Sequence, residues 1–176
     1  MKKQNLFIAS MATATMTSVL TAGISESVDV TFTLEFQTDN LGLVIIQDTF
    51  TATQVDVAGV LTLDFGGSGT ASVDEPGYVL EYSNLDTLLS GDEISGGGDA
   101  LLESFAGDEA FTFLFDGFGS TWDGSFASGV GVIEFTPVTG FTVDTHEMLW
   151  SVETVPAPGA LAVLGLAGLA RRRRRA

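Results

Sequence analysis

The sequence predicts an all-β body, an antiparallel β-sandwich or jelly-roll-like fold, and three observations favour this fold class. Of the 176 residues, 21 are Gly and 45% are apolar, which suits a turn-rich β protein better than a helical bundle. Apolar residues recur at every second position in several short segments. Gly-rich stretches separate these segments, so we expect several hairpins.

The clearest strand is expected at residues 28–36, where apolar residues alternate with Asp, Thr and Glu. This period of two places one face of the strand in a core and the other in water. The same criterion predicts strands at 44–53, 61–65, 78–82, 111–115, 130–136 and 148–152. Seven or more strands in about 130 residues is the number found in sandwiches and jelly rolls.

Two neighbouring segments are expected to lie outside the strands. Three consecutive glycines, Gly96 to Gly98, favour a mobile surface loop over residues 90–99 because glycine adds backbone freedom. Residues 99–105 follow as a short helix or turn, with Asp99 as its N-cap.

The charges of the chain are segregated by sign. All 23 acidic residues lie between Glu26 and Glu153, whereas Lys and Arg occur only at positions 2, 3 and 171–175. Such a body repels nucleic-acid phosphates and anionic lipid head groups, which argues against binding to either. The chain has no Cys, so disulfides, thiolate metal ligands and a Cys nucleophile are excluded.

The N-terminus has the order of a secretory signal peptide. Lys2 and Lys3 precede a largely apolar run at 6–20, and the small residues Thr21 and Gly23 suit a signal peptidase. We therefore expect a signal helix over residues 1–23, cleaved near Gly23, followed by the body at 24–154. A buried N-terminal helix is the alternative, since the apolar run is rich in Ala and Thr.

The C-terminus, residues 155–176, has three parts. Val155, Pro156, Ala157 and Pro158 favour an extended backbone. An uncharged run at 159–170 then predicts a short transmembrane-like helix of about 18 Å, less than the roughly 30 Å of a bilayer core. Arginines follow, and the positive-inside rule would keep them cytoplasmic. The membrane-directed residues are Gly159, Leu161, Val163, Leu164, Leu166, Leu169, Arg171, Arg172, Arg173, Arg174 and Arg175.

This order, Val-Pro-Ala-Pro, an apolar run and an arginine run, resembles the PEP-CTERM protein-sorting domain of bacterial exported proteins. The usual Pro-Glu-Pro of that family is departed from at Ala157. The resemblance implies cleavage near Pro156 to Pro158 by an exosortase-type membrane enzyme. It also implies anchoring through the tail before processing, then display at the cell surface or in the extracellular matrix of a Gram-negative-type bacterium. A plain tail anchor is the alternative.

One group of acids is a hypothetical metal site. Asp92, Glu93 and Asp99 flank the three glycines, and clustered carboxylates supply the oxygen ligands that calcium requires. The alternative is that they are solvated loop acids. No other cofactor is indicated.

No catalytic residues are assigned. His146 is the only His, interpreted as a lone surface residue, and no Gly-x-Ser-x-Gly nucleophile motif occurs. Trp122, with Phe118 and Phe126 nearby, is either a sugar-stacking surface or part of the core.

The sequence is therefore interpreted as an exported, non-catalytic structural protein of the cell surface or extracellular matrix. Its expected partners are signal peptidase, an exosortase-type enzyme, extracellular polysaccharide and, transiently, the membrane. A secreted carbohydrate-binding module and a secreted hydrolase are the alternatives.

Overall fold

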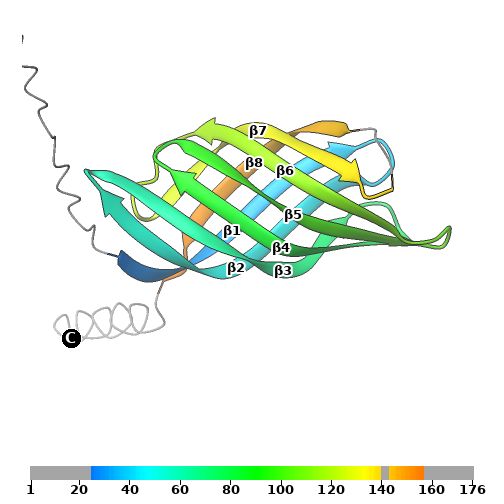
Figure 1. Ribbon diagram of the computed structural model, residues 1–176, viewed down its shortest axis with the longest axis horizontal. Helices are drawn as coiled ribbons and strands as arrows, with labels where there is room; N and C mark the ends of the chain where they lie inside the picture. Colours follow the sequence, from blue (N-terminus) through cyan, green and yellow to red (C-terminus); the bar gives the residue numbers. More distant parts are fainter. Residues whose placement is uncertain (1–24, 140–142, 157–176) are drawn as a thin grey trace, which may run out of the picture.

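The computed structural model describes residues 25–139 and 143–156, which form one closed barrel of antiparallel strands (Figure 1). The strands are β1 (Ser25–Thr38), β2 (Gly42–Val57), β3 (Val60–Val73), β4 (Tyr78–Ser90), β5 (Glu93–Ser104), β6 (Glu109–Gly119), β7 (Phe126–Pro137) and β8 (Asp144–Thr154). Each strand pairs with the next along the chain, and β8 pairs with β1 from Val30↔Thr154 to Phe36↔Met148. Closure leaves the sheet without an edge strand.

The predicted β-sandwich or jelly roll is wrong, because the eight strands form a single closed sheet. Alternating apolar residues report that one face of each strand is buried. They do not report whether that face packs against a second sheet or against the far side of its own sheet.

The described residues contain no helix, and therefore none long and apolar enough to cross a membrane. The expected signal helix (1–23) and the short apolar helix (159–170) lie outside the described residues.

All seven predicted strands are confirmed, but β5 replaces the predicted loop and helix at 90–105. Its glycines make room for aromatic rings. A Cβ at Gly96 would lie 2.5 Å from the ring of Phe115, and one at Gly98 would lie 3.1 Å from that of Phe113. These glycines therefore allow close packing across the barrel wall, as glycine does in strand interiors.

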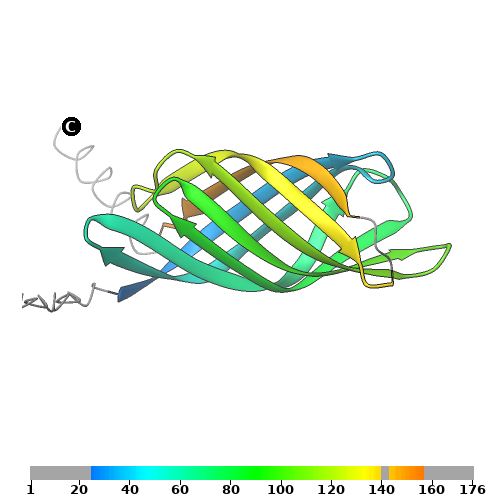
Figure 2. The same ribbon diagram turned by 45° about the horizontal axis from the view of Figure 1, so that its top comes forward.

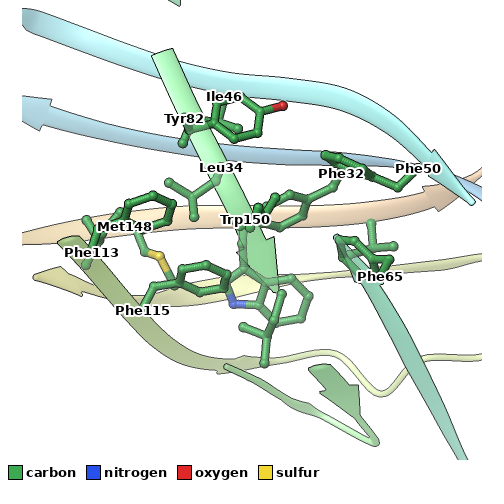
Figure 3. Close-up of a cluster of buried hydrophobic side chains, with 14 of the residues drawn as sticks. Phe32, Leu34, Ile46, Phe50, Phe65, Tyr82, Phe113, Phe115, Met148 and Trp150 are labelled. Carbon is green, nitrogen blue, oxygen red and sulfur yellow. The ribbon is translucent and has the colours of Figure 1, made fainter. Parts of the chain in front are cut away.

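The barrel interior is filled by apolar side chains from all eight strands (Figure 3). Phe32 lies near its centre and is fully buried, with its ring centroid 5.3 Å from that of Phe65 and 6.0 Å from that of Phe115. Trp150 and Met148 of β8 are also buried among these rings (Figure 3). In this middle section the barrel is a packed core.

The two ends of the barrel differ in what surrounds them. β1 begins and β8 ends at one end, which also carries the β2–β3, β4–β5 and β6–β7 connections. The opposite end carries the other four connections, and the β5–β6 hairpin projects from it (Figure 2). We call the first the closed end and the second the open end, for the reasons that follow.

Candidate functional site

The open end contains a cavity of about 480 Å³ between the inward-facing side chains of the barrel. Its wall is mostly apolar, with a few polar groups at the rim. The lining residues are Phe36, Thr38, Asn40, Leu41, Leu80, Leu102, Glu109, Phe111, Phe135, Pro137, Val143, Asp144 and His146. Pockets of this size and character are typical of small-molecule sites at barrel mouths.

The cavity lies where the inward-facing side chains of the strands reach the open end, and Leu41 of the β1–β2 connection, which is 8% exposed, also lines it. Phe36 and Leu80 are buried, whereas Leu102, Phe111 and Phe135 are only partly buried. Apolar side chains are also exposed in the connections of the open end: Phe105 in the β5–β6 connection is 99% exposed. Val138 and Val143, which flank the β7–β8 connection, are 65% and 50% exposed.

His146 is the least expected member of this site. Its side chain is only 14% exposed, and Nε2 lies 3.1 Å from Oδ2 of Asp144. The imidazole ring also lies near two phenyl rings, with centroid distances of 6.1 Å to Phe36 and 6.3 Å to Phe135. The interpretation of His146 as a lone surface residue is therefore wrong. Its two-residue spacing from buried Met148 was the signal that could have placed it inside.

The rim of the cavity is acidic. Asp39, Asp74, Asp108 and Asp144 lie in or beside the four connections of the open end, and Glu109 lines the cavity itself. Lys and Arg are absent from 25–139 and 143–156. The field at the opening is therefore negative and attracts cations.

The closed end is filled by Trp122, from the β6–β7 connection. Its side chain is 2% exposed, and its indole N–H donates a hydrogen bond to Oε1 of Gln54 at 2.9 Å. The Gln54 amide in turn donates to Oε1 of Glu26 at 2.7 Å. The backbone N–H of Trp122 donates to the carbonyl of Gly91 at 2.8 Å, which ties the connection to the β4–β5 turn. Sequence reasoning did not find Gln54 as the partner.

Trp122 does not share an exposed surface with its aromatic neighbours. Phe118 is 66% exposed and Phe126 is 46% exposed, while the Trp122 indole points into the barrel and is buried. The structure therefore places Trp122 in the core, the second of the two interpretations of the sequence.

A capped turn holds this connection in shape. Oδ1 of Asp123 accepts hydrogen bonds from the Ser125 hydroxyl at 2.7 Å, the Ser125 N–H at 2.8 Å and the Phe126 N–H at 3.0 Å. These bonds, led by that of the Ser125 hydroxyl, hold the pKa of Asp123 below its ordinary value.

The structure does not bring the proposed calcium ligands together. Asp92 lies in the β4–β5 turn, Glu93 begins β5, and Asp99 lies six residues further along the same strand. Oδ2 of Asp99 instead accepts a hydrogen bond from the Asn84 amide at 2.7 Å. In the part of the chain that the structure describes, no three His, Asp or Glu side chains are grouped to hold a metal ion.

Only the beginning of the predicted sorting motif lies within the described residues. Val155 and Pro156 directly follow β8, and the Val155 N–H donates to the Asp29 carbonyl at 2.8 Å. Ala157, Pro158, the membrane-directed positions of 159–170 and the arginines at 171–175 lie outside the described residues.

The pairing of β2 with β3 is interrupted in the middle of the two strands. These strands pair from Val44 to Ile45 and again from Thr53 to Val57, with no pairs between. In that interval the Tyr82 hydroxyl of β4 donates to Oδ2 of Asp48 at 2.9 Å. Burial, and then the bond and charge of Asp48, raise the pKa of Tyr82 above its ordinary value.

Tyr82→Phe is expected to lower the free energy of unfolding by about 1 kcal/mol at pH 7, because it removes this hydrogen bond. The deficit should shrink above about pH 10. Above that pH, Tyr82 ionises in the unfolded chain but stays protonated in the folded barrel, so the free energy of unfolding of the parent protein falls as the pH rises. The variant has no hydroxyl at this position, so this fall does not occur in it. Urea unfolding from pH 7 to 11 measures both curves. A deficit that does not change with pH would contradict the raised pKa.

No protein-family model and no curated protein matches the chain. Among solved structures, the chain is similar to the ywiB protein from Bacillus subtilis, with a TM-score of 0.34 and 14% sequence identity. That similarity covers 76% of this chain and 96% of the ywiB chain. A similarity this weak carries no information on the function of the chain.

Proposed function

We propose that this protein is exported and sorted to the cell surface or extracellular matrix, where its barrel has a structural, non-catalytic role. An exosortase-type enzyme cleaves near Pro156 to Pro158 and removes the C-terminal tail. The observation that carries the proposal is the charge segregation: every Lys and Arg lies near a chain end, and all 23 acidic residues lie between them. Basic residues flanking apolar runs are typical of segments that engage a membrane.

The surface of the barrel supports display in a hydrated matrix. Each strand contributes at least one exposed acid, among them Asp29, Asp56, Asp64, Glu81, Glu93, Asp116, Glu134 and Glu153. Divalent cations in solution would link such a surface to anionic polysaccharide, and a barrel without edges resists strand pairing with its neighbours at high density.

The position of the chain ends also supports the proposal. β1 begins where β8 ends, and the N–H of Val155 is bonded to Asp29 at that point. The predicted signal peptide and the predicted sorting tail are therefore both joined to the barrel at its closed end. A barrel held by its tail would present the open end away from the membrane.

The proposal is tested by the intact mass and location of the full chain expressed in a Gram-negative host, with and without an exosortase-type enzyme. We expect loss of residues 1–23 in both hosts and loss of the tail only when the enzyme is present. Replacing Pro156 and Pro158 with Ala should block the second cleavage, whereas Pro76→Ala, at an exposed turn of the open end, should not. A surface protein that retains Arg171 to Arg175 in both hosts would instead be a tail-anchored protein.

A further inference from the structure

We propose that the cavity at the open end binds a small amphiphile that has an apolar chain and a protonated amine. This inference goes beyond the proposed function, which assigns no ligand to the barrel. It rests on the shape of the cavity, the chemistry of its wall and the sign of the charge at its rim.

The cavity is blind. Below it, Phe36 is 3% exposed and Leu80 is 4% exposed, and the core beneath them is packed (Figure 3). The opposite end of the barrel is filled by Trp122, so a ligand can enter and leave only at the open end. A pocket open at one end favours a ligand with two unlike parts, an inner apolar part and an outer polar part.

The wall selects the apolar part. Leu102, Phe111 and Phe135 line the cavity from three strands and are only partly buried. An alkyl or aromatic group placed there would remove apolar surface from water on both partners, at about 25 cal/mol per Å². A volume of about 480 Å³ accommodates a chain of moderate length with space for its head group.

The rim selects the polar part. Glu109 and Asp144 line the cavity, where Oδ2 of Asp144 lies 3.1 Å from Nε2 of His146, and Asp39, Asp74 and Asp108 lie in the surrounding connections. The described residues include no Lys or Arg to receive an anionic head group. An ammonium group is therefore attracted, and a carboxylate or sulfate on the same chain is repelled.

The test uses the full chain and three ligands that share an eight-carbon chain: octylammonium, octanol and octanoate. Isothermal titration calorimetry at pH 7 and fixed ionic strength should give the order octylammonium, then octanol, then octanoate. We expect at least about tenfold tighter binding of the cation than of the anion, which corresponds to about 1.4 kcal/mol. Equal affinity for cation and anion, or no binding of octylammonium, would overturn the proposal.

Variants separate the cavity from general attraction to an acidic surface. Leu102→Trp fills the cavity and should weaken octylammonium binding by about tenfold or more, since it displaces the chain. Leu114→Trp is the matched control, because Leu114 lies on the outer face of β6 and is 67% exposed. If Leu102→Trp binds octylammonium as well as the parent does, the amine is held by the exterior and the proposal is wrong.

A charge variant keeps the test decisive if Leu102→Trp does not fold. Glu109→Gln should weaken binding of octylammonium severalfold and leave that of octanol unchanged, because only the first ligand is charged. Glu153→Gln removes the same charge at the closed end and should change neither. Equal effects of the two charge variants would show attraction to net charge alone, and would contradict a site at the open end.

Discussion

Phe32→Ala is expected to lower the free energy of unfolding by about 3 to 5 kcal/mol, the usual cost of truncating a buried phenylalanine. Phe32 is fully buried, and its ring packs between those of Phe65 and Phe115. These partners come from β3 and β6, so neither can follow the truncated side chain without moving a strand of a closed sheet. A cavity should therefore remain, with loss of aromatic packing in addition to lost burial.

Equilibrium unfolding in urea measures this loss as a lower midpoint at a similar slope. Thr31→Ala is the matched control in the same strand, because Thr31 faces outward and its hydroxyl contacts only that of Thr49, at 3.4 Å. We expect it to change stability by less than about 0.5 kcal/mol. Equal losses in the two variants would mean that the barrel interior is not a packed core.

The sequence is sufficient to predict most of the strands because alternation reports burial directly. In β1, Val30, Phe32, Leu34 and Phe36 are all buried, as their period of two requires. Closure of the barrel depends on the pairing of β1 with β8, which are more than 100 residues apart in the chain. No local pattern specifies that pairing, so the same strands suit a sandwich equally well.

The sequence predicts a loop at 90–99 in place of β5 because glycine occurs both in flexible loops and in strands that pack closely against large side chains. A run such as Gly96 to Gly98 is typical of a loop, and here it lies in a strand covered by rings from β6. Only the positions of Phe113 and Phe115 across the sheet distinguish the two cases. The short helix or turn predicted at 99–105 is wrong for a different reason, because Ala100 and Leu102 face inward with the period of a strand.

The open-end cavity could not be assembled from the sequence for a different reason. Phe36, Leu80, Phe111 and Phe135 lie in predicted strands, whereas Leu41 and Val143 lie outside them and Leu102 lies in the segment predicted as a helix or turn. Whether these side chains fill the end of the barrel or leave a cavity there depends on the lengths of the strands and on the connections between them. Trp122 is the converse case, since it lies in a connection with no periodicity and becomes buried by folding over the closed end.

Trp122→Ala is expected to lower the free energy of unfolding by about 3 to 5 kcal/mol. The variant loses a buried indole and also leaves the Gln54 carbonyl oxygen without its donor inside the closed end. Trp122→Phe keeps a buried aromatic ring but loses the pyrrole ring and its N–H, so we expect a smaller cost of about 1 to 3 kcal/mol. Phe118→Ala, at an exposed aromatic in the same region, serves as the control and should cost little.

A double-mutant cycle separates the hydrogen bond from the packing at the closed end. Trp122→Phe and Gln54→Ala are each combined with the parent residue and with one another, and urea unfolding gives the four free energies. A coupling of about 1 kcal/mol is expected for a direct bond. A sugar-stacking role makes the opposite prediction: Trp122→Ala would abolish glycan binding and leave stability unchanged, with no coupling to Gln54. Because the indole is 2% exposed and hydrogen-bonded inward, we expect the loss of stability and the coupling.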